Sequence, residues 1–452
     1  MTEATADSPA ATGSTKSGSL FKAGARTRKR HASERRFRLM GLSAVIFGIL
    51  ALVGLMTSIL SNGLSSFQQT YVTMDVFLDP AKLDKGGNLD PADLEKITTF
   101  TIQPLIQTAM QKTLEELGIA AEGVNAKQAF DLISKEAPGE LRRYILADPT
   151  RIGKTVSFDL LASGRIDGYY KGRVTMESAA LDSNVSPEQL MLADKLKQAG
   201  ILEARFNWSF FTAPDASDTR PEAAGLGVAI LGSAYMMMIV LVLALPIGVA
   251  ASIYLEEFAP QNRWTDLIEV NISNLAAVPS IVFGILGLAI FINFVGLPQS
   301  APIVGGLVLT LMTLPTIIIA TRSALKAVPP SINDAALGIG ASKMQAIFHH
   351  ILPLAAPGIL TGTIIGLAQA LGETAPLLLI GMVAFVREYP GAPPEGFFDP
   401  ASALPVQVYN WTQRGDPAFV ERASGAIIVL LIFLVIMNAV AILLRRRFER
   451  RW

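Results

Sequence analysis

Six long apolar runs, separated by polar sequence, dominate the chain. The first run, residues 39–60, contains no charged side chain, and five more runs follow Gly225. An α-helix rises about 1.5 Å per residue, so about 20 apolar residues cross a hydrocarbon core of about 30 Å. We therefore predict six membrane-spanning helices, at residues 39–60, 226–253, 275–295, 303–320, 358–386 and 426–444.

The longest polar stretch, residues 61–224, has the signals of a folded domain of mixed helix and strand. Ser186 and Asp90 each precede a proline, which is typical of a helix cap followed by the first helical turn. Gly200 is expected to end the helix that Ser186 begins. Alternating apolar residues at 156–175 favour a β-hairpin. We expect this α/β domain to be inserted after the first span.

Composition agrees with a membrane protein, since 51% of the residues are hydrophobic and only 17% are charged. Lys and Arg number 38, as do Asp and Glu, so the chain has no overall attraction to nucleic acid. Residues 1–38 are rich in small polar residues and then basic, which predicts a disordered cytoplasmic tail. A cleaved signal peptide is the alternative for residues 39–60. This run is longer than the apolar part of a signal peptide and lacks a convincing cleavage site, which favours an anchor.

The sequence predicts neither a metal site nor a cofactor. It has no cysteine, and the adjacent His349 and His350 would point to different faces of a helix. The acidic segment 79–93 misses the ligand spacing of an EF-hand and is better explained by helix capping. The chain also lacks a Gly-x-x-x-x-Gly-Lys-Ser/Thr loop, so any ATP hydrolysis that its function needs is expected from a partner and not from this chain.

The orientation follows from the basic residues beside the first and last spans. Cytoplasmic flanks are rich in Lys and Arg, so the basic tail and the arginines at 445–451 are both expected in the cytoplasm. An even number of spans agrees with this. The same parity puts residues 61–224 and 387–424 outside, and residues 254–274 and 321–357 inside.

The cytoplasmic loop 321–357 predicts two short helices joined at a glycine. Ser331 suits a helix cap, which would put Asp334 at the third helical position, where the helix dipole favours a carboxylate. Gly340 permits a sharp turn of the chain. The loop is therefore expected to form a structured cytoplasmic knob, and the alternative is an amphipathic helix that lies on the membrane.

This loop resembles the EAA loop of ABC importer permeases, whose short helix docks in a cleft of the ATP-binding subunit. The resemblance rests on Asp334-Ala335-Ala336, then Gly340, then Leu352-Pro353. It departs from the family at Asp334, where glutamate is usual, and at His350, a position that is commonly aliphatic. The resemblance implies that the following residues couple transport to the ATPase: Asp334, Ala335, Ala336 and Gly340.

The fifth predicted span carries a carboxylate, Glu373, in apolar sequence. A charge at the centre of a membrane helix costs at least about 2.5 kcal/mol unless it is paired or hydrated, so Glu373 is a functional candidate. Its segment, Gly-Glu-Thr-Ala-Pro-Leu at 372–377, resembles the signature of A-type permeases of phosphate-specific ABC importers. Further segments that resemble the same permeases lie at residues 206–211, 254–260 and 278–284.

One departure from those permeases concerns the partner of Glu373. They often carry an arginine one turn before the glutamate, and here that position is Gln369. Arg322, at the end of the fourth span, is a candidate substitute, with an interfacial anchor as its alternative role. The candidate pathway residues are Glu373, Thr374, Gln369 and Arg322.

The resemblance implies a mainly α, six-span permease of the type I ABC importer kind in the bacterial inner membrane, with both termini cytoplasmic. It also implies its partners: two ATP-binding subunits, a homologous second permease, an extracytoplasmic phosphate-binding protein and membrane lipid. The first span and residues 61–224 resemble the N-terminal extension of long-form A-type permeases, and the sequence does not indicate what that extension does. Two alternatives stay open, an importer of sulfate, molybdate or another oxyanion, and a membrane-anchored sensor.

Overall fold

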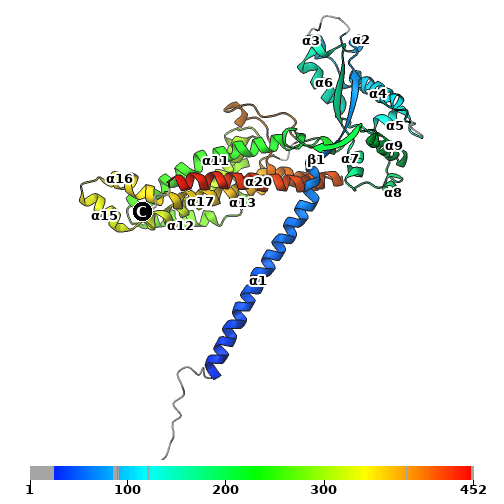
Figure 1. Ribbon diagram of the computed structural model, residues 1–452. Coiled ribbons are helices and arrows are strands. Elements are labelled where there is room, and N and C mark those ends of the chain that lie inside the picture. The colour runs from blue at the N-terminus through cyan, green and yellow to red at the C-terminus, as the bar shows by residue number, and fades with distance from the viewer. Residues whose placement is uncertain (1–24, 85–88, 90, 120–122, 383–384, 449–452) are drawn as a thin grey trace, which may run out of the picture. The chain divides into compact units, whose positions relative to one another are not determined.

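The computed structural model describes residues 25–84, 89, 91–119, 123–382 and 385–448 (Figure 1). Two units are distinguished, one up to Ser58 and one from Ile59 to the C-terminus. The described chain is mainly helical, with a single three-stranded sheet. This agrees with the predicted division into apolar helices and one α/β domain.

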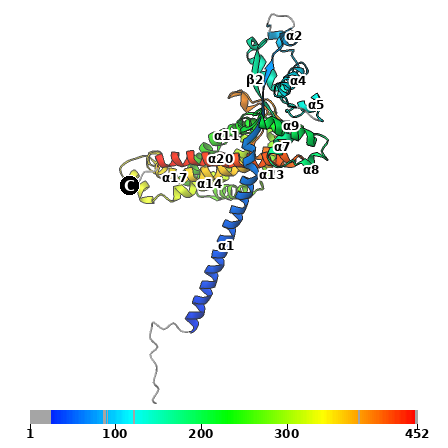
Figure 2. The same cartoon turned by 45° about the vertical axis from the view of Figure 1, so that its right-hand side comes forward.

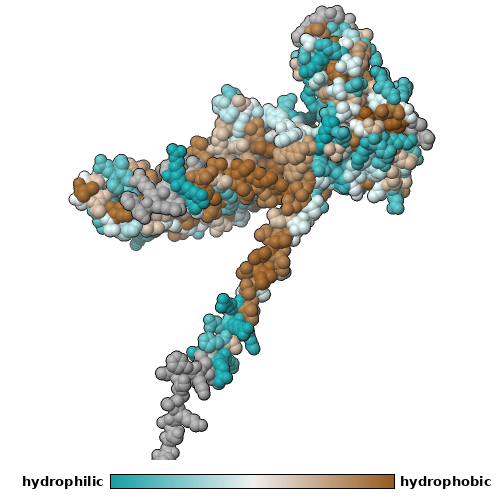
Figure 3. Space-filling view, in the orientation of Figure 1, coloured by the Kyte–Doolittle hydropathy of each residue, from teal (hydrophilic) through white to brown (hydrophobic). Residues whose placement is uncertain are grey.

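The first helix, α1 (Ala25–Gly63), begins well before the predicted span. Residues 25–38, expected to be disordered, are the N-terminal part of this helix, whereas residues 1–24 lie outside the described residues. Arg, Lys, Ala and Glu are good helix formers, and a helix propagates easily once its apolar part has formed. Figure 3 shows hydrophilic residues followed by a hydrophobic stretch along α1.

Five described helices are long and apolar enough to cross a membrane, and a sixth span results if one bent helix pair is counted. The helices α11, α14, α17 and α20 run side by side (Figure 2), and α14 packs against both α11 and α17. Small residues permit close approach: a Cβ on Gly248 would lie 2.7 Å from Ile317. The helices of this bundle are α11 (Gly227–Ile253), α12 (Arg263–Ala276), α13 (Ser280–Gly287), α14 (Pro302–Lys326), α17 (Leu352–Gly372), α18 (Ala375–Leu379), α19 (Leu404–Gln413) and α20 (Pro417–Phe448).

The third and fifth predicted spans are not single helices, which corrects the sequence prediction. The third is the bent pair, in which α12 meets α13 and its π-helical extension η5 (Leu288–Phe294) at 101°. Pro279 explains the break, because it lacks an N–H and disfavours helix at the residue before it. The fifth span ends at Gly372, and α18 follows two residues later.

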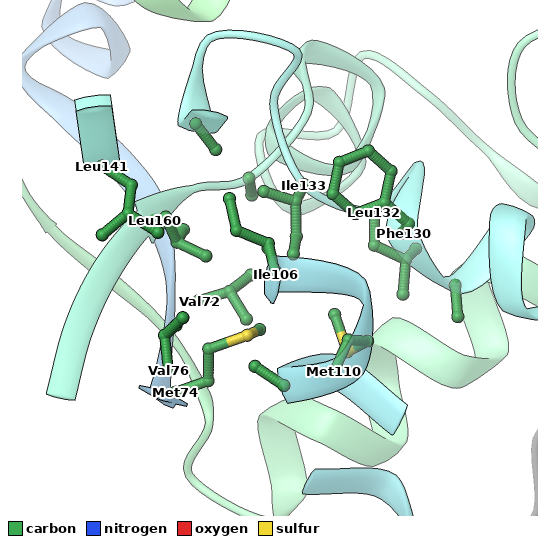
Figure 4. Packing of buried hydrophobic residues seen from close by; sticks show 14 of the residues in the cluster. Val72, Met74, Val76, Ile106, Met110, Phe130, Leu132, Ile133, Leu141 and Leu160 are labelled. Atoms are coloured by element: carbon green, nitrogen blue, oxygen red, sulfur yellow. The ribbon is translucent and has the colours of Figure 1, made fainter. Parts of the chain in front are cut away.

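The polar domain is built on an antiparallel sheet in the order β2-β1-β3. Val72 on the central strand lies opposite Leu160 on one side and Leu202 on the other. These residues and the buried face of α4 form the core (Figure 4). The main elements are β1 (Gln68–Phe77), β2 (Thr155–Leu161), β3 (Leu202–Phe206), α4 (Thr99–Glu116), α6 (Ala137–Ala147), α7 (Gly164–Tyr170) and α9 (Pro187–Gln198).

The remaining helical segments are short and connect these elements. They are η1 (Leu64–Phe67), α2 (Pro80–Leu83), α3 (Pro91–Leu94), α5 (Ala126–Phe130), η2 (Pro149–Arg151), α8 (Met176–Ala179), α10 (Ser209–Thr212), η3 (Pro221–Ala223), η4 (Tyr254–Phe258), α15 (Pro330–Gly338), α16 (Lys343–Ala346), η6 (Ile347–Ile351) and η7 (Glu395–Phe397).

Local capping signals were more reliable than strand signals in this domain. Ser186 forms a capping box with Gln189, and α9 is followed by Gly200 at φ +75°, as predicted. Asp79 accepts a hydrogen bond from Ala81 N and caps α2, while residues 85–88 and 90 lie outside the described residues. The predicted hairpin at 156–175 is wrong: β2 pairs with β1, and helix α7 follows.

Candidate functional site

Two of the family-like segments, far apart in sequence, pack directly against each other. Gly284 of α13 faces Pro376 of α18, and a Cβ on Gly284 would lie 2.6 Å from the Pro376 Cα. Three residues further along α13, a Cβ on Gly287 would lie 3.4 Å from a methyl carbon of Ile380. Because the contacts advance in the same direction along both segments, the two helix breaks lie toward the same end of this pair.

Glu373 lies in the break between α17 and α18, not inside a helix as the sequence predicted. Its backbone is extended, with φ −76° and ψ 130°, and its side chain is half-buried. Within the described part of the chain, its carboxylate has no hydrogen bond or ion pair. Thr374 next to it is also half-buried, whereas Gln369, one turn earlier on α17, is exposed. The structure thus groups Glu373 and Thr374 at the break but gives Glu373 no partner.

Arg322 does not serve as that partner, which corrects the sequence-based suggestion. Its guanidinium donates to Glu269 of α12 at 2.6 Å and to Glu256 of η4 at 3.3 Å. Lys326, one turn later on α14, lies 3.5 Å from the same Glu256 carboxylate. The arginine therefore fastens the end of α14 to two neighbouring segments.

The loop that resembles a coupling segment contains one separate helix, α15, and a capped second helix. Helix α15 begins at Pro330, so Pro329 and not Ser331 occupies the cap, and Asp334 lies beyond the predicted third position. A proline suits the first helical position because its missing N–H would have no helical partner there. Gly340 turns the chain at φ +91°, as expected for a sharp turn at a glycine.

The second helix of the loop is capped by Ser342 and runs through α16 and η6 into α17 without a stop. It is therefore longer than the short helix predicted. On α15, Asp334 and Ala335 are exposed and Ala336 is buried, while Ile339 just beyond it is 84% exposed. The segment around α15 and Gly340 thus offers solvent a mixed polar and apolar surface.

The third family-like segment, at 254–260, supports this loop from the side. It contains η4, whose Glu256 binds Arg322 and Lys326 of α14. Lys343, at the start of α16, donates to the Glu257 carbonyl, and its ammonium lies 5.1 Å from the centre of the Phe258 ring. Segment 254–260 therefore ties α14 and α16, the two ends of the loop, to α11.

A buried group of charges joins the α/β domain to the start of α20. Glu421 of α20 accepts a hydrogen bond from Lys171 Nζ at 3.0 Å and lies 2.7 Å from Arg173 Nε. Lys171 and Arg173 also contact Asp167 of α7, at 2.8 and 3.4 Å. Because buried charges are costly unless they are paired, this network stabilises one arrangement of the domain on α20.

Arg422 completes the junction from the next position of α20. Its guanidinium is buried and donates to the carbonyls of Ala224 and Glu222, at 2.6 and 2.7 Å. It also donates to Gln69 Oε1 of β1 at 2.9 Å. One side chain thus connects the sheet, the segment before α11 and the last span.

Two carboxyl groups near the junction have perturbed acidities. Burial raises the pKa of Glu222, and the hydrogen bond from Ser134 opposes that shift. Burial also raises the pKa of Glu140 to about 7, against the influence of Arg143 and reinforced by Glu136 and Glu222. Glu222 lines a polar cavity of about 360 Å³ together with Arg165 and Asp416. The α/β domain and the helix bundle therefore meet through buried polar groups.

Comparison with known proteins gives separate matches for the N-terminal and C-terminal parts of the chain. Residues 244–452 match the family described as "Binding-protein-dependent transport system inner membrane component". Residues 24–180 match a domain of unknown function, DUF3333. The permease PstA 2 of the phosphate transport system from Mycobacterium bovis is 32% identical over 251 residues, which is 55% of this chain and 79% of that protein. The chain belongs to the PstA-like family of ABC transporter permeases.

Other relatives agree with this assignment. The phosphate transport system permease protein PstA of Xylella fastidiosa (strain Temecula1) is 32% identical over 49% of this chain and 76% of its own length. The probable ABC transporter permease protein YqgI of Bacillus subtilis is 32% identical over 48% of this chain and 78% of its own. The family confirms the predicted multi-pass membrane permease subunit of an ABC importer.

Among solved structures, the permease is similar to a chain of the MetNI methionine ABC transporter. The overlap covers 49% of the permease and 97% of that chain, with 18% identity and a TM-score of 0.38.

Several residues that organise these sites were not predicted from the sequence. Glu421 and Arg422 form a charged pair just before the last apolar run, which is a detectable signal for a buried contact. Lys171 and Arg173 gave no such signal, because they follow Asp167-Gly168 in what resembled an ordinary turn. Glu256 was part of a segment recognised only by its family resemblance, without a role.

Proposed function

We propose that the permease carries inorganic phosphate in an ATP-driven importer of the type I kind. The observation that carries this proposal is the relationship to proteins named phosphate transport system permeases, which extends over 79% of one such relative. The segment at 372–377, by which the sequence resembles phosphate permeases, forms the break at Glu373. The nearby α13 begins after its own break, and the N–H groups at a helix start favour a negatively charged ligand.

Uptake of labelled phosphate tests this proposal directly. We expect cells that lack other phosphate importers, and that carry this permease with its partner subunits, to accumulate phosphate in an ATP-dependent way. Unlabelled phosphate should suppress this uptake, and the same excess of sulfate or molybdate should leave it unchanged. Suppression by sulfate or molybdate, together with transport of that anion, would assign the permease to another oxyanion.

The proposed partners follow from what the chain lacks and from its family. No phosphate-binding loop for ATP occurs in the sequence, so two ATP-binding subunits are assigned to the cytoplasmic segment around α15 and Gly340. The family description, a binding-protein-dependent system, supports an external protein that delivers phosphate. A homologous second permease would complete the pathway. Motion of the two ATP-binding subunits would be transmitted to this pathway through α15.

The coupling role of this segment predicts a selective effect at Gly340. Its φ of +91° is strained for any residue with a Cβ, so Gly340→Val should distort the turn after α15. We expect loss of phosphate uptake with normal insertion into the membrane, measured by uptake and by membrane fractionation. Gly338→Ala is the control, because a Cβ at Gly338 meets no atom within 4 Å. Normal uptake by Gly340→Val would contradict the coupling role.

We further propose that both termini and the segment around α15 are cytoplasmic, and that the α/β domain lies outside. The chain has no natural cysteine, so single cysteines can be labelled cleanly. Leu181 in the domain is 92% exposed and Ile339 near α15 is 84% exposed. A membrane-impermeant maleimide added to intact cells should label Leu181→Cys but label Ile339→Cys only after the cells are opened. The reverse result would invert the topology.

Glu373 is proposed to act in the pathway without binding phosphate as a free charge. A bare carboxylate would repel an anion, and Arg322 is already held by Glu256 and Glu269. We assign Glu373 to positioning a cationic or hydrogen-bonding group of the assembled pathway, or to remaining protonated, with gating as the consequence. Thr374 and Gln369 flank this position, and a purely structural link between helices is the competing role.

This role predicts a defect in transport without a defect in assembly. Glu373→Gln keeps the shape and hydrogen-bonding capacity of the side chain but removes its charge, so phosphate uptake should fall sharply. The complex should still be recovered with its ATPase subunits, and the ATPase should still turn over. Gln369→Glu restores a carboxylate one turn away on an exposed face, and it should not rescue the variant. Full uptake by Glu373→Gln would remove Glu373 from the mechanism, and failure to assemble would favour the structural role.

A further inference from the structure

The segment at 206–211, Phe-Asn-Trp-Ser-Phe-Phe, has no role in the proposed transport mechanism, and its side chains divide between two sides. Asn207 and Phe210 are buried, whereas Phe206 and Trp208 are exposed. The buried residues fix the backbone: Asn207 donates to the Ser66 carbonyl at 3.2 Å and accepts from Phe210 N at 3.1 Å. The buried contacts therefore fix the direction of the exposed rings, which point outward from an ordered backbone.

The outward rings form a continuous aromatic face with Phe67 and Phe211. The Phe206 and Trp208 ring centres are 4.8 Å apart, and those of Phe67 and Phe211 are 5.6 Å apart. Phe206 and Phe211 stack at 6.2 Å and connect the two pairs. Trp208 is 70% exposed, and the described chain provides no acceptor for its indole N–H. We call Phe67, Phe206, Trp208 and Phe211 the aromatic face.

The aromatic face lies where three predicted spans begin or end. Phe67 closes η1, which directly follows the end of α1 at Gly63. The carbonyl of Phe210 accepts a hydrogen bond from Leu226 N at 2.8 Å, at the first residue of the second predicted span. A Cβ on Gly425, just before the last predicted span, would lie 3.1 Å from the Phe210 ring. The ends of three predicted spans thus meet around Phe67 and Phe210, whose ring centres are 5.6 Å apart.

We propose that the aromatic face is a membrane anchor, which holds the base of the α/β domain in the lipid headgroup region. Tryptophan and other aromatic side chains favour this region because they offer apolar surface together with a polar group such as the indole N–H. The exposure of Trp208, its unpartnered N–H and its level at the span ends all fit this environment. The occupant of the face is therefore lipid at the headgroup and upper acyl level.

The anchor would act together with the buried charges on α20. Arg422, which connects the sheet to the last span, also lies 5.7 Å from the centre of the Phe210 ring. The inner side of the 206–211 segment thus contacts the protein junction, and its outer side would contact lipid. The α/β domain and α20 would then keep the same position relative to the bilayer surface during transport. This holds whichever anion is carried.

Depth-resolved fluorescence quenching tests this proposal on the full chain with its partner subunits in liposomes. Trp208→Cys is labelled with a small environment-sensitive fluorophore, with Leu181→Cys as a water-exposed control and Val435→Cys, 65% exposed on α20, as an acyl-level control. We expect the label at 208 to be quenched several-fold more by lipids with a nitroxide near the headgroup than by aqueous iodide. The Leu181 label should show the opposite order, and the Val435 label should respond best to nitroxides deep in the acyl chain.

Two outcomes would overturn the anchor. Quenching of the 208 label by iodide to the same extent as the Leu181 label would place the face in water. Protection from both iodide and lipid nitroxides would mean that a protein partner, such as the second permease or the binding protein, covers it. Phe206→Cys provides a second site on the same face should Trp208→Cys fold poorly, as judged by gel filtration of the assembled complex. Phosphate uptake by the labelled protein is measured in parallel, so loss of transport is distinguished from loss of the anchor.

Discussion

Every backbone N–H and C=O group within a hydrocarbon layer must find its partner inside the protein, because no water is available there. Helices α11, α14 and α20 satisfy this constraint by staying helical over their apolar lengths. The two broken spans do not, since one stops before Pro279 and the other at Gly372. Their second parts, α13 and α18, pack so closely at Gly284 that no side chain would fit between them. The interrupted backbone is thus placed where helices shield it, and a carboxylate becomes accessible at its edge.

The contacts around α14 relate this break to the segment around α15 and Gly340. Along its length α14 packs against α13 and α17, and at its end Arg322 and Lys326 bind Glu256 of η4. The same η4 receives Lys343 from the other side of Gly340. A displacement of α15 would therefore act on α14 and η4, which are held by paired charges and helix packing. Such contiguous contacts are the physical basis on which a motion can be transmitted.

The α/β domain is joined to the permease by interactions of a different kind. Its own core is apolar, whereas its junction with α20 consists of buried charges: Asp167, Lys171 and Arg173 on one side and Glu421 and Arg422 on the other. Removing one member of such a group leaves another charge buried without a partner, so the group favours one relative position. A domain held in this way is expected to move together with the last span.

Residues close together in sequence were predicted well. Apolar runs identified the spans, because a helix long enough to cross a bilayer must be apolar along its length. Ser186 and Gly340 were assigned correctly as cap and turn, whereas the predicted cap Asp90 lies outside the described residues. The helix starts at Ala25 and Pro330 were displaced from the predicted positions, since neighbouring residues also favour helix.

What the sequence determined by itself was therefore the membrane class, the family and the order of the spans. Only the tertiary structure decided that Glu373 lies in a break, that Arg322 binds Glu256 and Glu269, and that β2 pairs with β1. The reason is physical: hydropathy and capping act within one or two helical turns, whereas these three outcomes depend on which distant segments pack together. Charge pairing in particular depends on distance in space, and Lys171 gave no sign in the sequence that Glu421 would be its partner.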